Sequence, residues 1–205
     1  MSNLEQQHFL PGSDGEHEMQ QKFMTQDKAK DFYDRQMLEY LAPTMQTFIA
    51  LQEMVFISTS DQHGECDCSF RSGEAGFVTV LDDKRVIYPD YRGNGVLASV
   101  GNMSENPHIG MLFIDFFNDK VGLHVNGKAT ILDENQLLTL LKETRHDDAL
   151  IAETSSTQKT VFWVLVHVEE AYIHCSKNIP LFKKNNDSSL INKGRPIDYF
   201  ELSDA

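Results

Sequence analysis

Between residues 54 and 89, apolar stretches alternate with very short links, and this pattern constrains the fold more than any other feature. The links "DQHG" and "DDK" supply the Asp and Gly residues that tight turns favour. A parallel crossover needs a dozen or more residues, so links of this length can only join antiparallel strands. The sequence therefore predicts an antiparallel meander, with strands at 54–59, at 65–71 continued after an interruption by 77–81, and at 85–89.

Three later stretches continue the β pattern. Residues 108–115 are almost continuously apolar, as in a strand buried on both faces. Residues 121–132 alternate apolar and polar side chains, and residues 160–175 are rich in Val, Phe, Trp and Tyr. We therefore expect a mainly β protein, a small antiparallel β-barrel of about six strands with peripheral helices.

Helical periodicity is found outside these strands. Over residues 27–51 apolar side chains recur at helical spacing, and Pro43 divides this pattern into two helices. A further helix is predicted over residues 134–143, whereas residues 1–24 lack periodicity and are expected to form an arm. The predicted parts are an N-terminal arm with helices that pack on the barrel (1–50), the barrel (51–182) and a C-terminal tail (183–205).

The charge of the chain limits its partners. It carries 31 Asp and Glu against 18 Lys and Arg, a formal net charge of −13. Nucleic acids and anionic membranes are bound through basic patches, so we expect neither as a partner. The N-terminus shows no apolar signal segment, and no run approaches the ~20 apolar residues of a membrane span. We expect a soluble, cytoplasmic protein.

The cysteines do not indicate a disulfide framework or a metal site. There are three, Cys66, Cys68 and Cys175, and an odd, sparse set is not typical of disulfide-stapled folds. His63 lies near Cys66 and Cys68, but no fourth ligand follows at the spacing of a zinc site. No metal ligand is therefore predicted.

The run Gly-Asn-Gly-Val-Leu-Ala at residues 93–98 matches the dinucleotide fingerprint G-x-G-x-x-A, with Asp115 about 20 residues further on. A Rossmann turn is not expected, because residues 88–92 separate the strand from the first glycine and no βαβ repeat follows. Two interpretations remain. Asn94 can cap a short helix whose bare N–H groups bind an anion, with Gly95 allowing close approach. Alternatively, the run is only a turn and a cap.

Four longer stretches occur in a characteristic order: "DCSFRSGEAGFVTVLD" (67–82), "YPDYRGNGVLASVGNMSENPHIGMLFIDF" (88–116), "LHVNGKATI" (123–131) and "AYIHCSKNIP" (171–180). Together they resemble the FMN-binding split barrels related to pyridoxamine 5'-phosphate oxidase. The likeness spans most of the chain and is closer to a bacterial subgroup, whose lead-in is similar to "DGEHEMQQKF" (14–23), than to the oxidase itself. It implies a six-stranded antiparallel split barrel of the Greek-key type, and a homodimer with two FMN sites between the subunits.

The resemblance also implies which residues hold FMN. In the family, basic and hydroxyl side chains of the second barrel strand and of the strand-to-helix segment bind the flavin phosphate. Ser69 and Arg71 lie two residues apart in a strand and so share a face, where a hydroxyl and a guanidinium can grip one phosphate. The matching positions in this chain are Ser69, Arg71, Ser72, Tyr88, Pro89, Asp90, Asn94, Gly95 and Ser99.

Further cofactor-binding candidates lie on later strands. Asn126 and Lys128 share a strand face with His124, and the resemblance implies that they contact flavin ring oxygens or substrate across the dimer. A polar edge that faces solvent or a subunit interface is the alternative for these residues. Lys177, in the matching segment "CSKNIP", and His174 can approach the site from the last strand or simply lie on the surface.

The chain departs from the family in two ways. Relatives nearer to the oxidase carry Arg or Lys just after the Ser or Asn at the helix start, where this chain has Gly95. The C-terminal segment with Arg and Trp that holds the oxidase substrate is also missing, because the only tryptophan, Trp163, lies inside a strand pattern. Oxidation of pyridoxamine phosphate is therefore not expected.

Two functions remain as hypotheses. The first is an FMN-dependent oxidoreductase that acts on a small-molecule substrate by hydride transfer through the flavin N5, with dioxygen or a nicotinamide closing the cycle. The cofactor carries the chemistry in such enzymes, so no catalytic side chain is assigned. The second is a non-catalytic carrier or sensor of flavin, deazaflavin or haem, which the missing base and the missing substrate segment favour.

Overall fold

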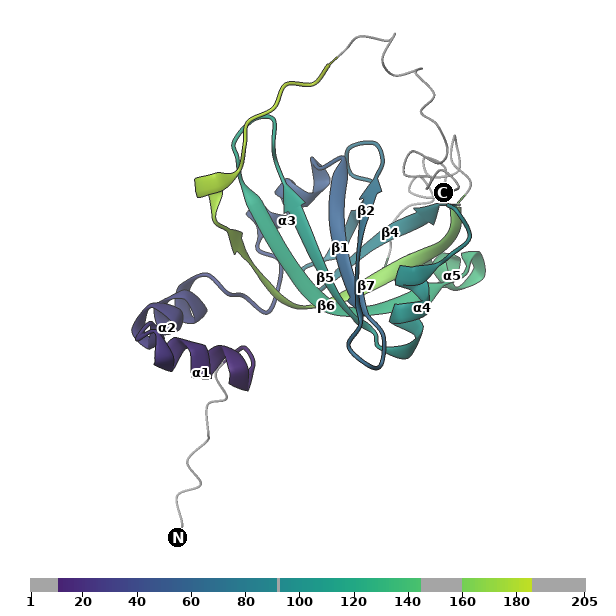
Figure 1. Ribbon diagram of the computed structural model, residues 1–205. Helices are drawn as coiled ribbons and strands as arrows, with labels where there is room; N and C mark the ends of the chain where they lie inside the picture. The colour runs from purple at the N-terminus through teal and green to yellow at the C-terminus, as the bar shows by residue number, and fades with distance from the viewer. Residues whose placement is uncertain (1–10, 92, 145–159, 186–205) are drawn as a thin grey trace, which may run out of the picture.

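The computed structural model describes residues 11–91, 93–144 and 160–185 (Figure 1). Seven strands in this part form one antiparallel sheet, which confirms the mainly β class. Their order across the sheet is β2 (Cys66–Ser72), β1 (Met54–Ser60), β5 (His108–Ile114), β6 (Gly122–Leu132), β7 (Thr160–His174), β4 (Arg85–Tyr91) and β3 (Thr79–Asp82).

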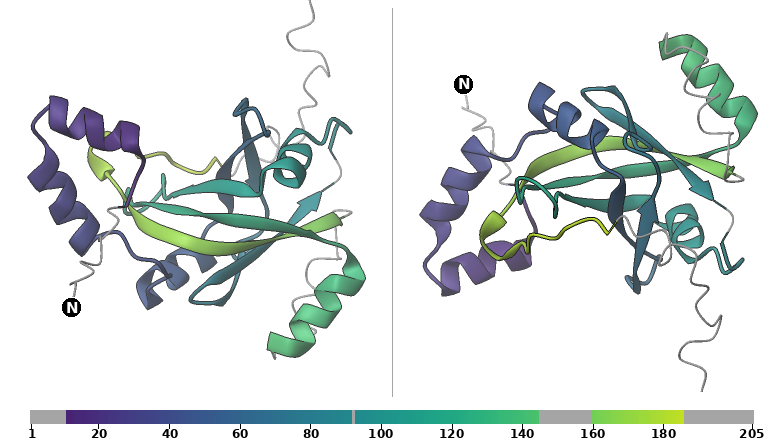
Figure 2. Two further views of the ribbon diagram at one scale, coloured as in Figure 1. Left: turned by 90° about the horizontal axis from the view of Figure 1, so that it is seen from below. Right: turned by 90° about the horizontal axis from the view of Figure 1, so that it is seen from above.

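A short link determines the shape of this sheet. β2 and β3 are edge strands at opposite ends of the sheet, yet only residues 73–78 join them. In a flat sheet, spacings of ~4.8 Å between neighbours would hold the edges about 29 Å apart, whereas the chain from Ser72 to Thr79 spans at most about 25 Å. The sheet must therefore curl until its edges approach each other, which produces a barrel that is split between β2 and β3 (Figure 2).

The strand count corrects the prediction of six strands. That prediction treats residues 65–71 and 77–81 as one interrupted strand, but the structure places these segments in β2 and β3, at opposite edges. At the interruption Gly76 adopts a φ of +85° and donates its N–H to the carbonyl of Gln52 over 3.2 Å. The chain thus leaves one edge of the sheet there and begins the other.

The helices lie around the barrel (Figure 2). In the described part they are α1 (Asp14–Lys22), α2 (Gln26–Arg35), α3 (Pro43–Ala50), α4 (Ala98–Glu105) and α5 (Glu134–Thr144). The two helices divided by Pro43 are confirmed as α2 and α3, and Pro43 begins α3, where its missing N–H leaves no hydrogen bond unmade. No described helix is both long enough and apolar enough to cross a membrane.

The core explains the burial pattern of the strands. Val86 and Tyr88 of β4 face the barrel interior, whereas Ile87 between them packs with Leu137 of α5 and with Trp163. β4 is therefore buried on both faces, and its sequence shows no polar alternation. Since Asp90 lies at the end of this strand, its carboxylate is also buried.

α1 is a helix that the sequence analysis did not predict, and it lies within residues 1–24, where an arm was expected. None of its residues is buried, so it lacks the apolar periodicity that signals a helix in a sequence. It begins instead with the hydroxyl of Ser13, which accepts the N–H of Glu16 over 3.1 Å, in the Ser-x-x-Glu order of a capping box. Gln20 Nε2 donates to the hydroxyl of Tyr33 over 2.6 Å and so attaches α1 to α2.

A substitution at Gly127 tests the pairing of the two longest strands, β6 and β7. The register of β6 and β7 shifts at this glycine, and a Cβ there would lie 2.0 Å from the carbonyl oxygen of His167. Gly127→Ala should therefore lower the free energy of unfolding by about 3 kcal/mol, because the backbones of two strands must separate. Gly101→Ala in α4, where a Cβ meets nothing within 4 Å, should raise it by up to about 1 kcal/mol. Urea denaturation measures both, and similar effects would contradict this register.

Candidate functional site

A pocket of about 590 Å³ lies where the two edges of the sheet meet. Its walls come from β2, the end of β4, the link 93–97 and the first turn of α4, which packs on β1 and β2 (Figure 1). This volume lies within the range of sites that bind small molecules, roughly 300–1,000 Å³. The curl of the sheet thus creates the pocket, because it brings β2 and β4 together although four strands lie between them in the sheet.

An ion pair joins the two walls. Arg71 of β2 donates from Nη2 to Asp90 of β4 over 3.1 Å, and from Nη1 to the carbonyl of Phe70 over 3.1 Å. Both side chains are largely buried, at 20% and 9% exposure. The Nε–H of Arg71 is buried without a partner among the described residues. The guanidinium is therefore held in one orientation and still has an unused N–H.

Tyr88 lies within electrostatic reach of both members of this ion pair. Its side chain is fully buried, and burial raises the pKa of its hydroxyl far above the usual range. The hydroxyl has no partner among the described residues. Tyr88 therefore remains a neutral, protonated phenol next to Arg71 and Asp90.

A second polar group in the pocket consists of one carboxylate and two hydroxyls. Ser69 Oγ donates to Asp67 Oδ2 over 2.9 Å. The buried Ser99 Oγ, at the start of α4, lies 3.0 Å from the same carboxylate oxygen and 3.0 Å from Ser69 Oγ. We call these three residues, Asp67, Ser69 and Ser99, the acceptor corner. It fastens β2 to α4.

The link before α4 corrects the predicted helix start. Asn94 is not the N-cap: α4 begins at Ala98, after Leu97 with a left-handed φ of +56°, and Asn94 Oδ1 accepts the N–H of Val96 over 3.0 Å. Gly95 has a φ of +85°, a conformation that side chains other than glycine adopt only with strain. Relatives of the oxidase carry a base at this position. In this chain the positive φ of residue 95 favours glycine there.

The structure brings most of the predicted site residues together. Seven line the pocket: Ser69, Arg71, Ser72, Asp90, Asn94, Gly95 and Ser99. Tyr88 and Pro89 are buried in β4 immediately before Asp90 and do not line it. Lys177 is exposed in a short 3-10 helix, η1 (Ser176–Asn178), and also lies outside the pocket.

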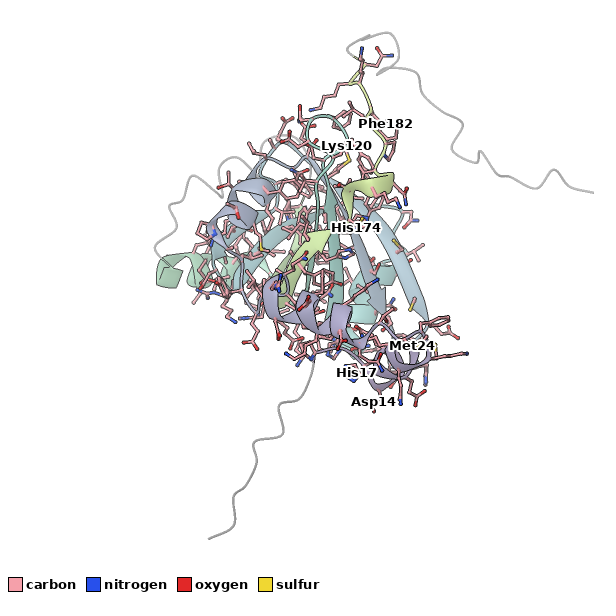
Figure 3. All side chains as sticks on the ribbon, turned by 90° about the vertical axis from the view of Figure 1, so that its left-hand side faces the viewer. Asp14, His17, Met24, Lys120, His174 and Phe182 are labelled. Carbon is pink, nitrogen blue, oxygen red and sulfur yellow. The ribbon has the colours of Figure 1, made fainter. Side chains whose placement is uncertain are left out.

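Asn126 and Lys128 lie on another face of the barrel. Asn126 Nδ2 donates to Glu170 of β7 over 2.7 Å, and Lys128 pairs with Glu169 over 3.0 Å. Next to them the imidazoles of His124 and His174 share a hydrogen bond of 2.8 Å, on the side of the barrel seen in Figure 3. These polar side chains link β6 to β7, and within one chain they do not reach the pocket at the split.

Sequence reasoning did not identify Asp67 as a site residue. Asp67, Ser69 and Arg71 occupy every second position of β2 and therefore share one face, so the period-two pattern could have found it. The apolar rim of the pocket was not predicted either, although part of it lies within the segment 94–99 that the resemblance implies. Phe70, Val96 and Leu97 line it and are 50%, 70% and 50% exposed.

These observations define the class of the protein as a split β-barrel with a polar pocket at its seam. The family model of pyridoxamine 5'-phosphate oxidase matches residues 41–175, and the chain belongs to this family. No curated protein matches the chain.

Several solved structures are similar over part of the chain. HupZ of Group A Streptococcus is 20% identical, with a TM-score of 0.48, and the match covers 64% of this chain and 92% of that one. An FMN-binding protein of Syntrophomonas wolfei is 14% identical (TM-score 0.45; 78% and 98% covered). HutZ of Vibrio cholerae, described as a haem storage protein, is 14% identical (TM-score 0.39; 65% and 93% covered).

The ion pair across the seam should contribute to stability. Asp90→Ala would leave the largely buried guanidinium of Arg71 without its charged partner, and the free energy of unfolding should fall by about 3 kcal/mol. Asp34→Ala removes the partner of Lys30 in an exposed pair (2.6 Å) and serves as the control, with almost no effect expected. Denaturant unfolding compares the two variants. An Asp90 variant as stable as the control would show that the pair does not hold the seam.

The histidine pair should make stability depend on pH. Burial and the neighbouring His174 lower the pKa of His124 below its usual value of about 6.5. The His124 side chain therefore binds a proton more readily in the unfolded chain than in the folded one. Its contribution to the free energy of unfolding is present above about pH 6.5 and is lost as the pH falls below that value. His124→Gln should reduce the loss of unfolding free energy between about pH 7.5 and 5.5, whereas His63→Gln, in an exposed turn, should not. Identical pH profiles for both variants would rule out this effect.

Proposed function

We propose that this protein binds FMN in the pocket at the seam and is an FMN-dependent oxidoreductase. Membership of the pyridoxamine 5'-phosphate oxidase family supports a flavin as the ligand. Bound FMN would supply hydride transfer through its N5 atom. The residues of this chain would bind the phosphate, orient the cofactor and cover part of it.

One observation carries the proposal: Arg71 is oriented before any ligand arrives. Asp90 and the carbonyl of Phe70 fix the guanidinium, and its buried Nε–H lacks an acceptor among the described residues. A phosphate oxygen is such an acceptor, and charge-assisted bonds from Arg to phosphate are among the stronger hydrogen bonds in proteins. The amino end of α4, where no side chain caps the helix, also lines the pocket and adds a weak attraction for negative charge.

The charges of the pocket limit the affinity for FMN. Its described lining holds one cation, Arg71, against two carboxylates, Asp67 and Asp90. Asp90 neutralises the guanidinium that it positions, so a phosphate gains less from charge than at a site with free bases. Hydrogen-bond geometry must therefore supply more of the binding free energy, and we expect a weaker FMN site than one with several bases.

We further propose that two copies of the chain form a homodimer around the site. Phe70, Val96 and Leu97 form an exposed apolar rim beside the polar pocket, and a second copy would cover it. Asn126 and Lys128 lie outside the pocket of their own chain. If they contact the flavin, they do so from the partner subunit.

A second candidate function is that of a non-catalytic haem carrier. The observation that favours it is the pair of part-buried imidazoles of His124 and His174, because histidine is a common axial ligand of haem iron. Haem would then bind on the face of β6 and β7 and not at the seam.

Absorption spectra of the purified protein distinguish these functions. The protein is mixed with FMN and passed over a desalting column, and the proposal predicts that it then shows a flavin spectrum. This spectrum should bleach with NADPH under anaerobic conditions and return in air. An intense haem band after mixing with haemin, lost in His124→Ala together with His174→Ala, would support the carrier. A protein that shows no binding when it is titrated with FMN would rule out the proposed function.

Arg71 should determine how tightly FMN binds. Arg71→Ala removes a charge-assisted hydrogen bond and should weaken FMN binding by about 1.5–3 kcal/mol. Arg71→Lys keeps the charge but loses the fork geometry, so its loss should be intermediate. Arg85→Ala, which breaks a pair with Asp82 outside the pocket, is the matched control. Isothermal titration with FMN measures these affinities, and unchanged binding in Arg71→Ala would remove Arg71 from the site.

A further inference from the structure

The positions of the hydroxyl protons in the acceptor corner determine what it can bind. A serine hydroxyl has one proton to donate, and an ionised carboxylate has none. Ser69 donates its proton to Asp67 Oδ2 over 2.9 Å. Among the described residues, the acceptors within reach of the Ser99 hydroxyl are Asp67 Oδ2 and Ser69 Oγ, each at 3.0 Å. Both protons are therefore used inside the corner.

The corner consequently presents only acceptors to the pocket. Hydroxyl lone pairs and the second carboxylate oxygen of Asp67, Oδ1, remain for a ligand, and all three residues line the pocket. A phosphate oxygen is also an acceptor and carries the same charge as Asp67, so it is repelled here. Ligand groups with hydrogen to donate, such as hydroxyls, are attracted.

The pocket thus has two ends with opposite preferences on one strand face. Asp67 and Ser69 belong to the acceptor corner, whereas Arg71, two residues beyond Ser69 in β2, is the cationic end. Alternate residues of a strand lie about 6.5–7 Å apart. A ligand that satisfies both ends has an anionic group and, several ångströms away, a chain or ring that carries hydroxyls.

We propose that the acceptor corner binds the hydroxyls of a phosphorylated polyol, and that Asp67 selects for this part of the ligand. This inference rests on the proposed function, since in FMN the hydroxyl-bearing ribityl chain lies next to the phosphate. Ser69 and Ser99 then act by orienting Asp67 and do not donate to the phosphate. Arg71 binds the phosphate, and Asp67 recognises the chain attached to it.

Asp67→Asn is the direct test, because the amide has the shape of the carboxylate but lacks its charge and one acceptor. It should weaken riboflavin about tenfold or more, as for hydrogen bonds to a charged group, and FMN by the same factor or somewhat less, because the repulsion of the phosphate is also removed. Binding of inorganic phosphate should be unchanged or slightly tighter. Asp27→Asn, an exposed carboxylate in the first turn of α2, is the matched control and should bind all three probes like the wild type.

Ser99→Ala provides a second test with the opposite expectation. Because the proton of Ser99 points into the corner, its removal frees an acceptor of Asp67, and FMN should bind within about twofold of the wild type. If Ser99 instead donates to the phosphate, FMN binding should fall about tenfold. That loss would overturn the inference. This test does not depend on Asp67→Asn, so it can be done even if that variant does not fold.

D-ribitol 5-phosphate, which lacks the flavin ring, separates this inference from the proposed function. If the wild type binds it but not FMN, and Asp67→Asn weakens that binding, the inference stands and the proposed function is wrong. If the wild type binds FMN but Asp67→Asn leaves riboflavin unchanged or tightens FMN, the inference is wrong and the function stands. A wild type that binds none of the probes overturns both.

Discussion

The six residues between β2 and β3 impose the constraint on which the rest of this structure depends. They join the two edges of a seven-stranded sheet, and they are too short to do so unless the sheet curls. Once it curls, Arg71 at one edge meets Asp90 near the other, and the start of α4 lies against β2. The pocket is thus a consequence of chain connectivity, and its charged residues come from segments that are distant in the sheet.

The same closure supports the proposal that this acidic protein binds an anion. The chain has a formal net charge of −13, so its overall field repels a phosphate. The structure instead presents one guanidinium, fixed by a buried carboxylate, and keeps the second carboxylate, Asp67, engaged with two serine hydroxyls. Such a site discriminates by the placement of donors and acceptors more than by net charge. A ligand with one anionic group and several hydroxyls matches this arrangement.

Much of the fold could be predicted from the sequence, because strands and short links leave a local signature. The shared face of Ser69 and Arg71 also followed from the two-residue period of a strand, and both line the pocket. α1 could not be found through apolar periodicity, since it buries nothing, although the capping box at Ser13 marks its start. The start of α4 was misplaced because Asn94 forms a local turn and Leu97 takes a left-handed conformation. The Arg71–Asp90 pair depends on closure of the sheet, which no local pattern encodes.

A crystal structure of the protein grown with FMN tests the central claim most directly. The account predicts one phosphate at the seam between β2 and β4, with an oxygen about 3 Å from the guanidinium of Arg71 and the ribityl hydroxyls turned toward Asp67. A flavin bound elsewhere on the barrel, or one at the seam with its phosphate directed away from Arg71, would contradict it.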